Sequence, residues 1–432
     1  MRLWKWLYPG IGLKRWIALL ALSLLLAMIG VAAIIHSFIA PLVELNADLR
    51  LLDFLLAGPA LLGLAIIAGG ALLFVYSLRR LLGRINTENE RIVDSLYRRQ
   101  KLDKGPSITA LGGGTGLSNL LRGLKHETGN INAIVTVADD GGSSGKLRDE
   151  LSMPPPGDIR NCLVALADTE PLMEELFQYR FSSDGHLVGH SFGNLFIASM
   201  NQVVDDFEDA VRGSSRVLAV RGQVLPATKE NVRLGAEYRD GSDRMGESLI
   251  PLEDKKIDRV FLQPRDCQAS ERTVSALSIA EVITVGPGSL YTSILPNLLI
   301  EDIVEEIKES SAPAIYICNI MTQPGETDGY DAADHVRAIT RHAGEQIFDW
   351  IIVNREPVPE DVARRYRHEG AFPVEYEERQ LREMGLKVRS AELLQRRGEQ
   401  YLRHDPQKLA GIVLEITRRE RGGQDNRHVL YG

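Results

Sequence analysis

The chain has 432 residues, of which 25% are charged and 44% hydrophobic, and its formal net charge is −8. This is the composition of a folded protein with one large or two smaller domains, and the acidic balance argues against a nucleic-acid-binding protein, which would carry a basic face. The three cysteines are widely spaced and odd in number, which indicates reduced thiols and excludes a disulfide framework.

Two uncharged apolar runs stand at the start of the chain, at residues 17–35 and 54–78. Each is long enough to cross a bilayer core of roughly 30 Å as a helix. The first run shows no convincing signal-peptide cleavage site and is followed by the second. We therefore interpret residues 1–80 as a transmembrane helical hairpin that stays on the protein.

Basic residues flank both apolar runs, whereas the segment between them is mostly acidic. Lys14 and Arg15 precede the first run, Arg79 and Arg80 follow the second, and only Arg50 is basic in between. The positive-inside bias predicts a two-pass protein of the bacterial cytoplasmic membrane, with both termini and the main domain in the cytoplasm. The runs contain few polar residues, so we expect a tether in the membrane lipid rather than a transporter.

The remaining chain predicts an α/β domain. Residues 81–104 are charged and heptad-like, which indicates a juxtamembrane helix, either a homodimer stalk or a solvated linker. Over 105–355, strands alternate with helices, which predicts a Rossmann-like, doubly wound, mainly parallel sheet. We expect a helical C-terminal segment of the same domain at 356–420 and a frayed tail at 421–432. The predicted strands are 107–111, 132–138, 216–221, 259–263, 282–285, 313–318 and 349–353.

A glycine-rich turn follows the first predicted strand, in the sequence SITALGGGTG at residues 107–116. Such a turn before a helix lets the backbone approach a ligand and presents N–H groups and the positive helix end to an anion. It matches neither the dinucleotide fingerprint nor the P-loop, since no lysine stands beside Thr115. A tight turn without a ligand is the alternative interpretation.

The next predicted strand ends in two carboxylates, Asp139 and Asp140, within IVTVADDGGSSGKLR at residues 134–148. In an open parallel sheet, ligands bind at the carboxyl ends of the strands. The two turns together therefore predict a phosphate-bearing ligand, with magnesium as a divalent metal that the two aspartates would hold.

Four further polar loops stand at strand ends or helix starts. Each by itself can be a capped turn, but such loops gather on one edge of a doubly wound sheet. Their glycine N–H groups, amides and the fork of Arg160 suit a nucleotide that carries a diphosphate. The loops are PPPGDIRN at 154–161, GHSFGN at 189–194, VGPGSLYT at 285–292 and CNIMTQPGETD at 318–328.

These motifs, in this order, resemble the YvcK family of bacterial gluconeogenesis factors, within the CofD-like superfamily of 2-phospho-L-lactate transferase. The resemblance covers roughly 107–345. It implies a Rossmann-like domain that binds UDP-sugars such as UDP-N-acetylglucosamine and supports cell shape and cell-wall precursor synthesis during gluconeogenic growth. It implies no catalytic activity for this branch. The membrane hairpin departs from the common soluble members, and no quoted motif matches the segment after about 355.

The expected function is a membrane-tethered, cytoplasm-facing UDP-sugar-binding regulator whose partners are envelope-synthesis proteins. The alternative is a magnesium-dependent transferase that moves a phosphate-linked group from a nucleotide donor to a hydroxyl acceptor, with Asp139, Asp140 and His190 as its catalytic residues. A nicotinamide-dinucleotide dehydrogenase fits less well, because the glycine fingerprint is wrong. Carried over by position, the ligand-binding residues are Gly112, Gly113, Gly114, Thr115, Gly116, Asn119, Asp139, Asp140, Ser143, Arg148, Asp158, Arg160, His190, Asn194, Gly288, Ser289, Asn319, Thr322 and Gln323.

Overall fold

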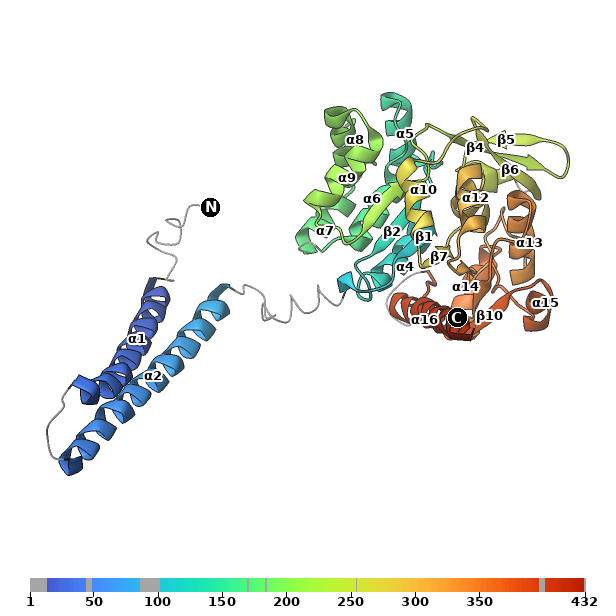
Figure 1. Ribbon diagram of the computed structural model, residues 1–432. Helices are drawn as coiled ribbons and strands as arrows, with labels where there is room; N and C mark the ends of the chain where they lie inside the picture. The colour runs from blue at the N-terminus through green and yellow to red at the C-terminus, as the bar shows by residue number, and fades with distance from the viewer. Residues whose placement is uncertain are drawn as a thin grey trace. The chain divides into compact units, whose positions relative to one another are not determined.

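The computed structural model describes residues 14–43, 49–85, 102–168, 171–182, 185–253, 255–395 and 401–430. The chain forms two compact units, Met1–Gln100 and Lys101–Gly432 (Figure 1). Most of the predicted juxtamembrane helix, residues 86–101, lies outside the described residues.

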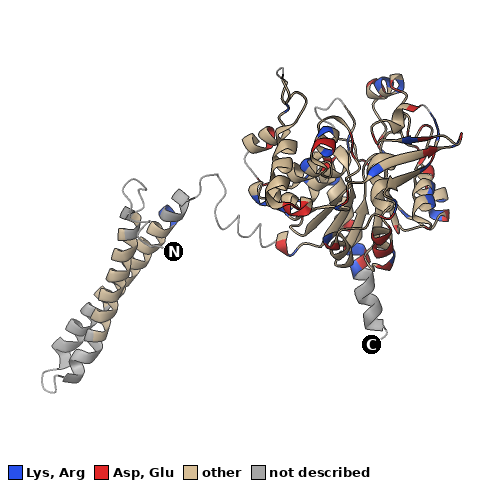
Figure 2. Ribbon diagram, turned by 90° about the horizontal axis from the view of Figure 1, so that it is seen from above, with Lys and Arg blue, Asp and Glu red and all other residues tan. Residues whose placement is uncertain are grey.

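The first unit is a pair of long apolar helices, α1 (Lys14–Val43) and α2 (Leu49–Ile85). Glycines allow them to approach closely, because a Cβ on Gly30 would lie 2.6 Å from Ile67 Cγ1. Segments 18–35 and 61–80 are long and apolar enough to cross a membrane, and only 11% and 17% of their residues are buried. Lys, Arg, Asp and Glu are sparse on these helices and frequent over the second unit (Figure 2).

The second unit is built on a seven-stranded parallel sheet with the order β10-β9-β8-β7-β1-β2-β3. The strand order reverses beside β1, so the topological switch point lies between β1 and β7. The predicted Rossmann-like, doubly wound fold is thereby confirmed. The strands are β1 Ile108–Gly112, β2 Ile131–Val135, β3 Gln223–Pro226, β7 Val282–Val285, β8 Ala314–Ile317, β9 Trp350–Asn354 and β10 Lys387–Ala391.

Helices flank the sheet (Figure 1), and its central strands are buried along their whole length, as expected of a parallel sheet covered on both faces. The helices of this unit are α4 Gly114–Leu124, α5 Gly142–Leu151, α6 Gly157–Leu166, α7 Pro171–Gln178, α8 Phe192–Val204, α9 Phe207–Val217, α10 Glu271–Ser278, α11 Leu295–Leu298, α12 Glu301–Glu309, α13 Ala332–Ala343, α14 Glu360–His368, α15 Glu378–Glu383 and α16 Pro406–Leu430, with a 3-10 turn η2 at Ile250–Glu253 and a π-helical turn η3 at Leu290–Ile294.

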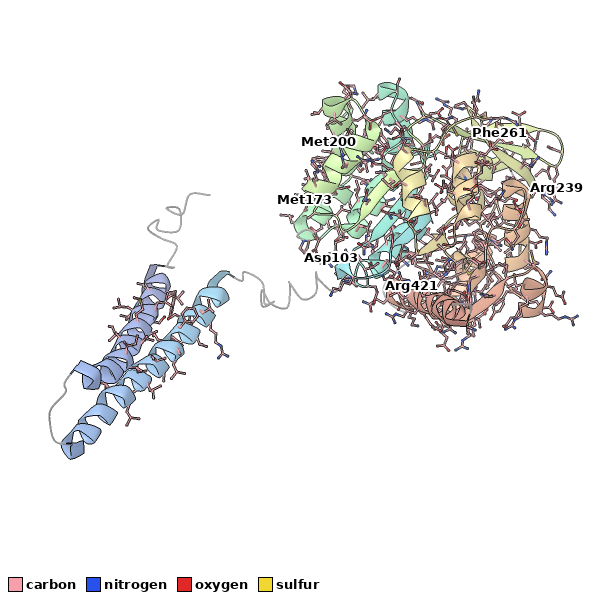
Figure 3. The ribbon with its side chains drawn as sticks, in the orientation of Figure 1. Asp103, Met173, Met200, Arg239, Phe261 and Arg421 are labelled. Atoms are coloured by element: carbon pink, nitrogen blue, oxygen red, sulfur yellow. The ribbon has the colours of Figure 1, made fainter. Side chains whose placement is uncertain are left out.

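A second, three-stranded antiparallel sheet has the order β5-β4-β6 and comprises β4 (Arg233–Tyr238), β5 (Asp243–Met245) and β6 (Ile257–Gln263). Figure 3 places Arg239 and Phe261 at this sheet, on the opposite side of the unit from Met173 and Met200 of α7 and α8. The predicted strand 259–263 therefore exists, but it belongs to this small sheet and not to the main one.

Three other element predictions were wrong. Residues 216–221 are not a strand: α9 runs to Val217, Leu218 caps it, and Ala219 has a φ of 47°, which no strand allows. The segment 356–420 is not purely helical, since β10 pairs in parallel with β9. Nor does the helix fray at 421, because α16 extends to Leu430. Ion pairs from β10 to α16, Lys387–Glu420 at 2.7 Å and Arg389–Glu415 at 2.9 Å, join these two elements.

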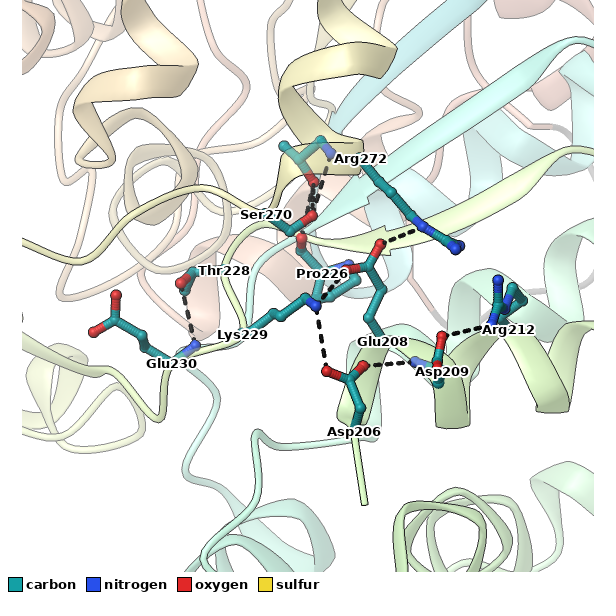
Figure 4. Close-up of polar contacts among 11 residues, drawn as sticks. Asp206, Glu208, Asp209, Arg212, Pro226, Thr228, Lys229, Glu230, Ser270 and Arg272 are labelled. Atoms are coloured by element: carbon teal, nitrogen blue, oxygen red, sulfur yellow. Dashed lines mark hydrogen bonds and ion pairs between the residues drawn. The ribbon is translucent and has the colours of Figure 1, made fainter. Parts of the chain in front are cut away.

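A network of charged side chains joins α9 to the start of α10 and to the turn between β3 and β4 (Figure 4). The Glu208 carboxylate is almost wholly buried and lies 3.3 Å from both Lys229 Nζ and Arg272 Nε. Asp206 caps α9 by accepting from Asp209 N, and it also pairs with Lys229 at 3.2 Å. Burial raises the pKa of Asp206, but the hydrogen bonds from Asp209 and Lys229 outweigh it, so the pKa is lowered. The network is structural and lies apart from the candidate site.

Candidate functional site

A cavity of about 470 Å³ opens at the carboxyl ends of β1, β2, β7 and β8. It lies at the switch point, where doubly wound folds bind ligands, and its volume is within the roughly 300–1,000 Å³ range of small-molecule sites. We refer to it as the switch-point cavity. Its walls are formed by Gly113, Gly114, Thr115, Gly116, Asn119, Thr136, Asp139, Asp158, Glu247, Pro287, Gly288, Ser289, Thr292, Ser293, Asn319, Ile320, Met321, Thr322, Gln323, Tyr366, Leu402, Arg403 and His404.

The glycine loop forms the first wall. Helix α4 begins at Gly114, and its N-cap residue, Gly113, has no side chain; the Asp158 carboxylate accepts a hydrogen bond from Gly114 N at this positive helix end. A Cβ on Gly113 would lie 2.6 Å from both Asp158 Oδ2 and Thr136 Cγ2, and one on Gly116 would collide with the Pro287 carbonyl. The loops after β1, β2 and β7 therefore meet at distances that only glycine allows.

The loops after β7 and β8 form the opposite wall. The Asn319 amide holds Gly288 twice, because its Nδ2 donates to Gly288 O at 2.8 Å and its Oδ1 accepts from Gly288 N at 3.3 Å. Gln323 Nε2 donates to Ser289 Oγ at 2.7 Å. Ser289 stands at the N-terminal end of η3, and its own side chain does not cap this turn; the Glu326 carboxylate accepts from Tyr291 N at 3.2 Å. A second helix start thus borders the same cavity.

Thr322 lines the cavity but serves the backbone. Its hydroxyl accepts from Phe372 N at 2.9 Å, while Thr322 N donates to Phe372 O at 2.7 Å. This pair of bonds fixes the loop after β8 against the segment that follows α14. The expected contact between Thr322 and the ligand stays a prediction, and the Thr322 hydroxyl already has a backbone partner in Phe372.

Three carboxylates line the cavity: Asp139, Asp158 and Glu247. Burial, followed by repulsion from Asp139, raises the pKa of Asp158 to about 7, although Gly114 N donates a hydrogen bond to it. Burial and repulsion from Asp139 and Glu326 raise the pKa of Glu247 to about 8. The cavity therefore favours the protonated form of Asp158 and Glu247, or a cation bound beside them.

The structure does not bring Asp139 and Asp140 together in the cavity. Asp140 Oδ1 accepts from Ser248 N at 2.9 Å, outside the lining, and Asp158 takes its place beside Asp139. No group of three metal-ligating side chains is found among the described residues. Magnesium commonly uses one or two carboxylates plus ligand phosphates, so Asp139 and Asp158 fit a magnesium ion only together with a phosphate-bearing ligand.

Several predicted site residues lie behind the cavity wall. Ser143 Oγ is 3.0 Å from His190 Nδ1 and accepts from Asn194 Nδ2 at 3.1 Å. Arg160 donates to Ser191 Oγ at 2.5 Å. These buried contacts hold the starts of α5, α6 and α8 together. Gly112 ends β1 just behind the glycine loop.

Arg148 of α5 is also behind the wall and is only 1% exposed. Within the described part of the chain, no group accepts a hydrogen bond from its guanidinium. Burial and repulsion from Arg233 lower its pKa, while Asp140, Asp149 and Asp139 oppose this change. Its charge therefore acts on the aspartates at the end of β2 rather than through a direct bond.

The C-terminal segment contributes cavity residues that the sequence analysis missed, namely Tyr366, Leu402, Arg403 and His404. Asn119 Nδ2 donates to His404 O, and burial lowers the pKa of His404 to about 4, so its ring is neutral at physiological pH. The sequence carried one signal of a helix start here: Asp405, which follows the polar residues Arg403 and His404, caps α16. Other lining residues that were missed are Thr136, Glu247, Pro287, Thr292, Ser293, Ile320 and Met321.

The fold and the cavity define a Rossmann-like α/β protein with a polar ligand site at its switch point. The family model of 2-phospho-L-lactate transferase CofD matches residues 108–394. The chain belongs to this CofD-like family and, within it, to the gluconeogenesis factors of the YvcK type.

The gluconeogenesis factor of Bacillus subtilis is 50% identical over 313 residues, covering 72% of this chain and 98% of that protein. A relative from a Nostoc species is 46% identical over 423 residues, covering 95% of this chain and 92% of its own, so the similarity reaches into the first unit. A crystal structure from Bacillus halodurans has a TM-score of 0.70 at 50% identity and covers 72% of this chain and 100% of its own.

Proposed function

We propose that this protein is a membrane-tethered, cytoplasm-facing regulator that binds a UDP-sugar in the switch-point cavity. One observation carries the proposal: two helix starts, α4 at Gly114 and η3 at Leu290, and the glycine turns that precede them border a single cavity. Helix N-termini of this kind bind phosphate groups through backbone N–H donors and the helix dipole. A diphosphate between the two starts would lie against both glycine turns.

The C-terminal wall suits the nucleoside. Tyr366 lines the cavity, and its hydroxyl accepts from Leu402 N at 2.7 Å, which fixes the ring. An aromatic face of this kind stacks on a nucleobase and contributes about 1–3 kcal/mol. Arg403 lines the same wall. The choice of uridine follows the family resemblance.

The regulatory role follows the relatives, one of which bears the name gluconeogenesis factor. We infer a function in gluconeogenic growth, in cell shape and in the control of cell-wall precursor synthesis, through contacts with envelope-synthesis proteins. The first unit would hold the ligand-binding unit in the lipid of the cytoplasmic membrane.

The direct test is calorimetric titration of residues 102–432. These residues lie within a separate compact unit, and the Bacillus halodurans structure corresponds to this unit alone. UDP-N-acetylglucosamine, UDP-glucose, GTP and NAD are compared with and without magnesium. We expect saturable binding of a UDP-sugar, its loss in Ser289→Trp, which fills the switch-point cavity, and its retention in Ser199→Trp, an exposed position on α8. Absence of saturable binding to either UDP-sugar would refute the proposal.

A second candidate is a magnesium-dependent transferase that moves a phosphate-linked group to a hydroxyl acceptor. The observation in its favour is that Asp139 and Asp158 lie beside the glycine loop, where a metal bound to a diphosphate would be. It predicts magnesium-dependent consumption of a nucleotide donor, abolished in Asp139→Asn. A donor that stays intact during long incubation with magnesium and hydroxyl acceptors favours the regulator.

A further inference from the structure

A second cavity, of about 260 Å³, lies between α4 and α6. Four arginines line it, Arg122, Arg160, Arg180 and Arg403, and no carboxylate does. We refer to it as the arginine cavity. Its remaining lining residues are Thr115, Ser118, Asn119, Asn161, Val164 and Gln178.

One face of α4 supplies a wall of the arginine cavity. Thr115, Ser118, Asn119 and Arg122 are spaced at i, i+3, i+4 and i+7, which places them on one side of a helix. Thr115 and Asn119 also line the switch-point cavity, as does Arg403. The two cavities therefore meet at the start of α4, while Arg122 and Arg180 belong to the arginine cavity only.

No carboxylate in the described lining balances the charges of Arg122, Arg160 and Arg180. Arg160 is 7% exposed, donates to Ser191 and Asn161, and leaves its Nε without a partner among the described residues. Arg180 donates to a carbonyl, Gly189 O, at 3.1 Å. Arg122 pairs with Glu174 at 2.9 Å, outside the lining.

Repulsion between the arginines supports this description. Burial, followed by repulsion from Arg180, lowers the pKa of Arg160 to about 10, although attraction to Asp158 and Asp139 opposes this change. Like charges that are partly removed from water are costly unless an anion joins them. Guanidinium groups bind phosphate through paired, charge-assisted hydrogen bonds.

We propose that the arginine cavity is a second anion site that binds a phosphate group, separate from the nucleotide-sugar site. The ligand is a small phosphorylated molecule or inorganic phosphate. Because Thr115, Asn119 and Arg403 are shared, its occupant borders the ligand of the switch-point cavity. The inference itself does not depend on that ligand being a UDP-sugar.

The test is calorimetric titration of residues 102–432 with inorganic phosphate and, separately, with glycerol 3-phosphate. We expect saturable binding that Arg122→Gln and Arg180→Gln each weaken by about tenfold or more, since each removes a charged donor. Both side chains are partly or fully exposed, so the variants should fold. Arg379→Gln, at an 83% exposed side chain on α15, is the matched control and should bind as the native chain does. Tighter binding of glycerol 3-phosphate identifies an organic phosphate as the ligand, and equal binding identifies the free anion.

Ser289→Trp separates the two proposals, because Ser289 lines only the switch-point cavity. Phosphate binding that survives in Ser289→Trp supports the second site even if no UDP-sugar binds. Phosphate binding that Ser289→Trp abolishes and the arginine variants leave intact places the anion at the glycine loop and overturns the inference. Absence of saturable binding of either probe up to about 10 mM also overturns it.

Discussion

The ionisation of Asp158 depends directly on its place in the cavity wall. Its carboxylate accepts from Gly114 N at the start of α4 and is repelled by Asp139, and its pKa is about 7. A substantial share of the protein therefore carries Asp158 protonated at neutral pH when no ligand is bound. Any bound cation would lower this pKa and release a proton.

This shift predicts how the stability of the ligand-free domain depends on pH. The pKa of Asp158 is raised in the folded state, so between its ordinary value of 3.8 and about 7 the folded state binds more protons than the unfolded one. Stability then falls as pH rises through this window, by at most about 1.4 kcal/mol per pH unit for one group. In Asp158→Asn the fall over this window should be smaller, as measured by urea unfolding of residues 102–432 between pH 4 and pH 8.

Asp243→Asn, at an exposed position on β5, is the control and should follow the native profile. The Asp158 variant should still lose some stability as pH rises, because Glu247 lines the same cavity and its pKa is raised to about 8. If Asp158→Asn shows the same profile as the native domain, Asp158 is ionised across the window and the argument from repulsion is wrong.

At the scale of elements, α16 is seated on α4 by backbone contact. A Cβ on Gly123 of α4 would collide with the carbonyl oxygen of Pro406, where α16 begins, and Asn119 Nδ2 donates to His404 O. Arg403 and His404, which line the switch-point cavity, immediately precede this contact. The position of the cavity's C-terminal wall therefore depends on a residue that lines no part of it.

Gly123→Ala should consequently weaken ligand binding as well as stability. The added methyl meets backbone that cannot rotate away, so overpacking should cost about 1–3 kcal/mol, and the displaced Arg403 should raise the Kd for a UDP-sugar. Gly411→Ala on α16 is the matched control: its added Cβ would meet nothing within 4 Å, so it should be neutral or stabilise by up to about 1 kcal/mol. Equal effects of the two changes in urea unfolding and calorimetry would show that the α4–α16 contact does not position the wall.

The elements that could be predicted from the sequence are those whose apolar residues form an uninterrupted, buried run. The strands β1, β2 and β7 are of this kind, because both faces of the sheet are covered. Strand β10 was missed because it lies at the sheet edge and is exposed enough to carry Lys387 and Arg389. At 216–221 an apolar run suggested a strand, but α9 continues to Val217 and Leu218 caps it.

The candidate site was predictable where glycine and polar residues directly follow a strand, as at Gly113–Gly116 and Asn319. Asp140 shows the limit of that reasoning: it neighbours Asp139 in sequence, but it turns to Ser248. Tyr366 and Arg403 line the cavity through tertiary packing; the Asp405 cap marks the start of α16 but does not show that this start borders the cavity.

At the scale of the whole molecule, the two units differ in how their surfaces are composed. Large apolar side chains such as Met28 and Leu72 are 69% and 74% exposed on α1 and α2. A soluble protein rarely exposes so continuous an apolar surface, whereas lipid is a suitable environment for it. The second unit instead carries charged residues over its surface (Figure 2). These contrasting surfaces are the physical basis for proposing a membrane tether.

The full chain should therefore sediment with membranes after carbonate extraction, whereas residues 102–432 should remain in the soluble fraction, as followed by immunoblot of both fractions. The double variant Leu24→Asp, Leu72→Asp should shift the full chain toward the soluble fraction, because an aspartate at the centre of a spanning helix costs about 2.5–3.5 kcal/mol. Leu172→Asp, at a position on α7 of the second unit that is 72% exposed, should have no such effect. Protease added to intact spheroplasts should leave the second unit whole if it faces the cytoplasm. Carbonate extraction of the native full chain would show that α1 and α2 do not cross the bilayer, and cleavage of the second unit in spheroplasts would reverse the orientation.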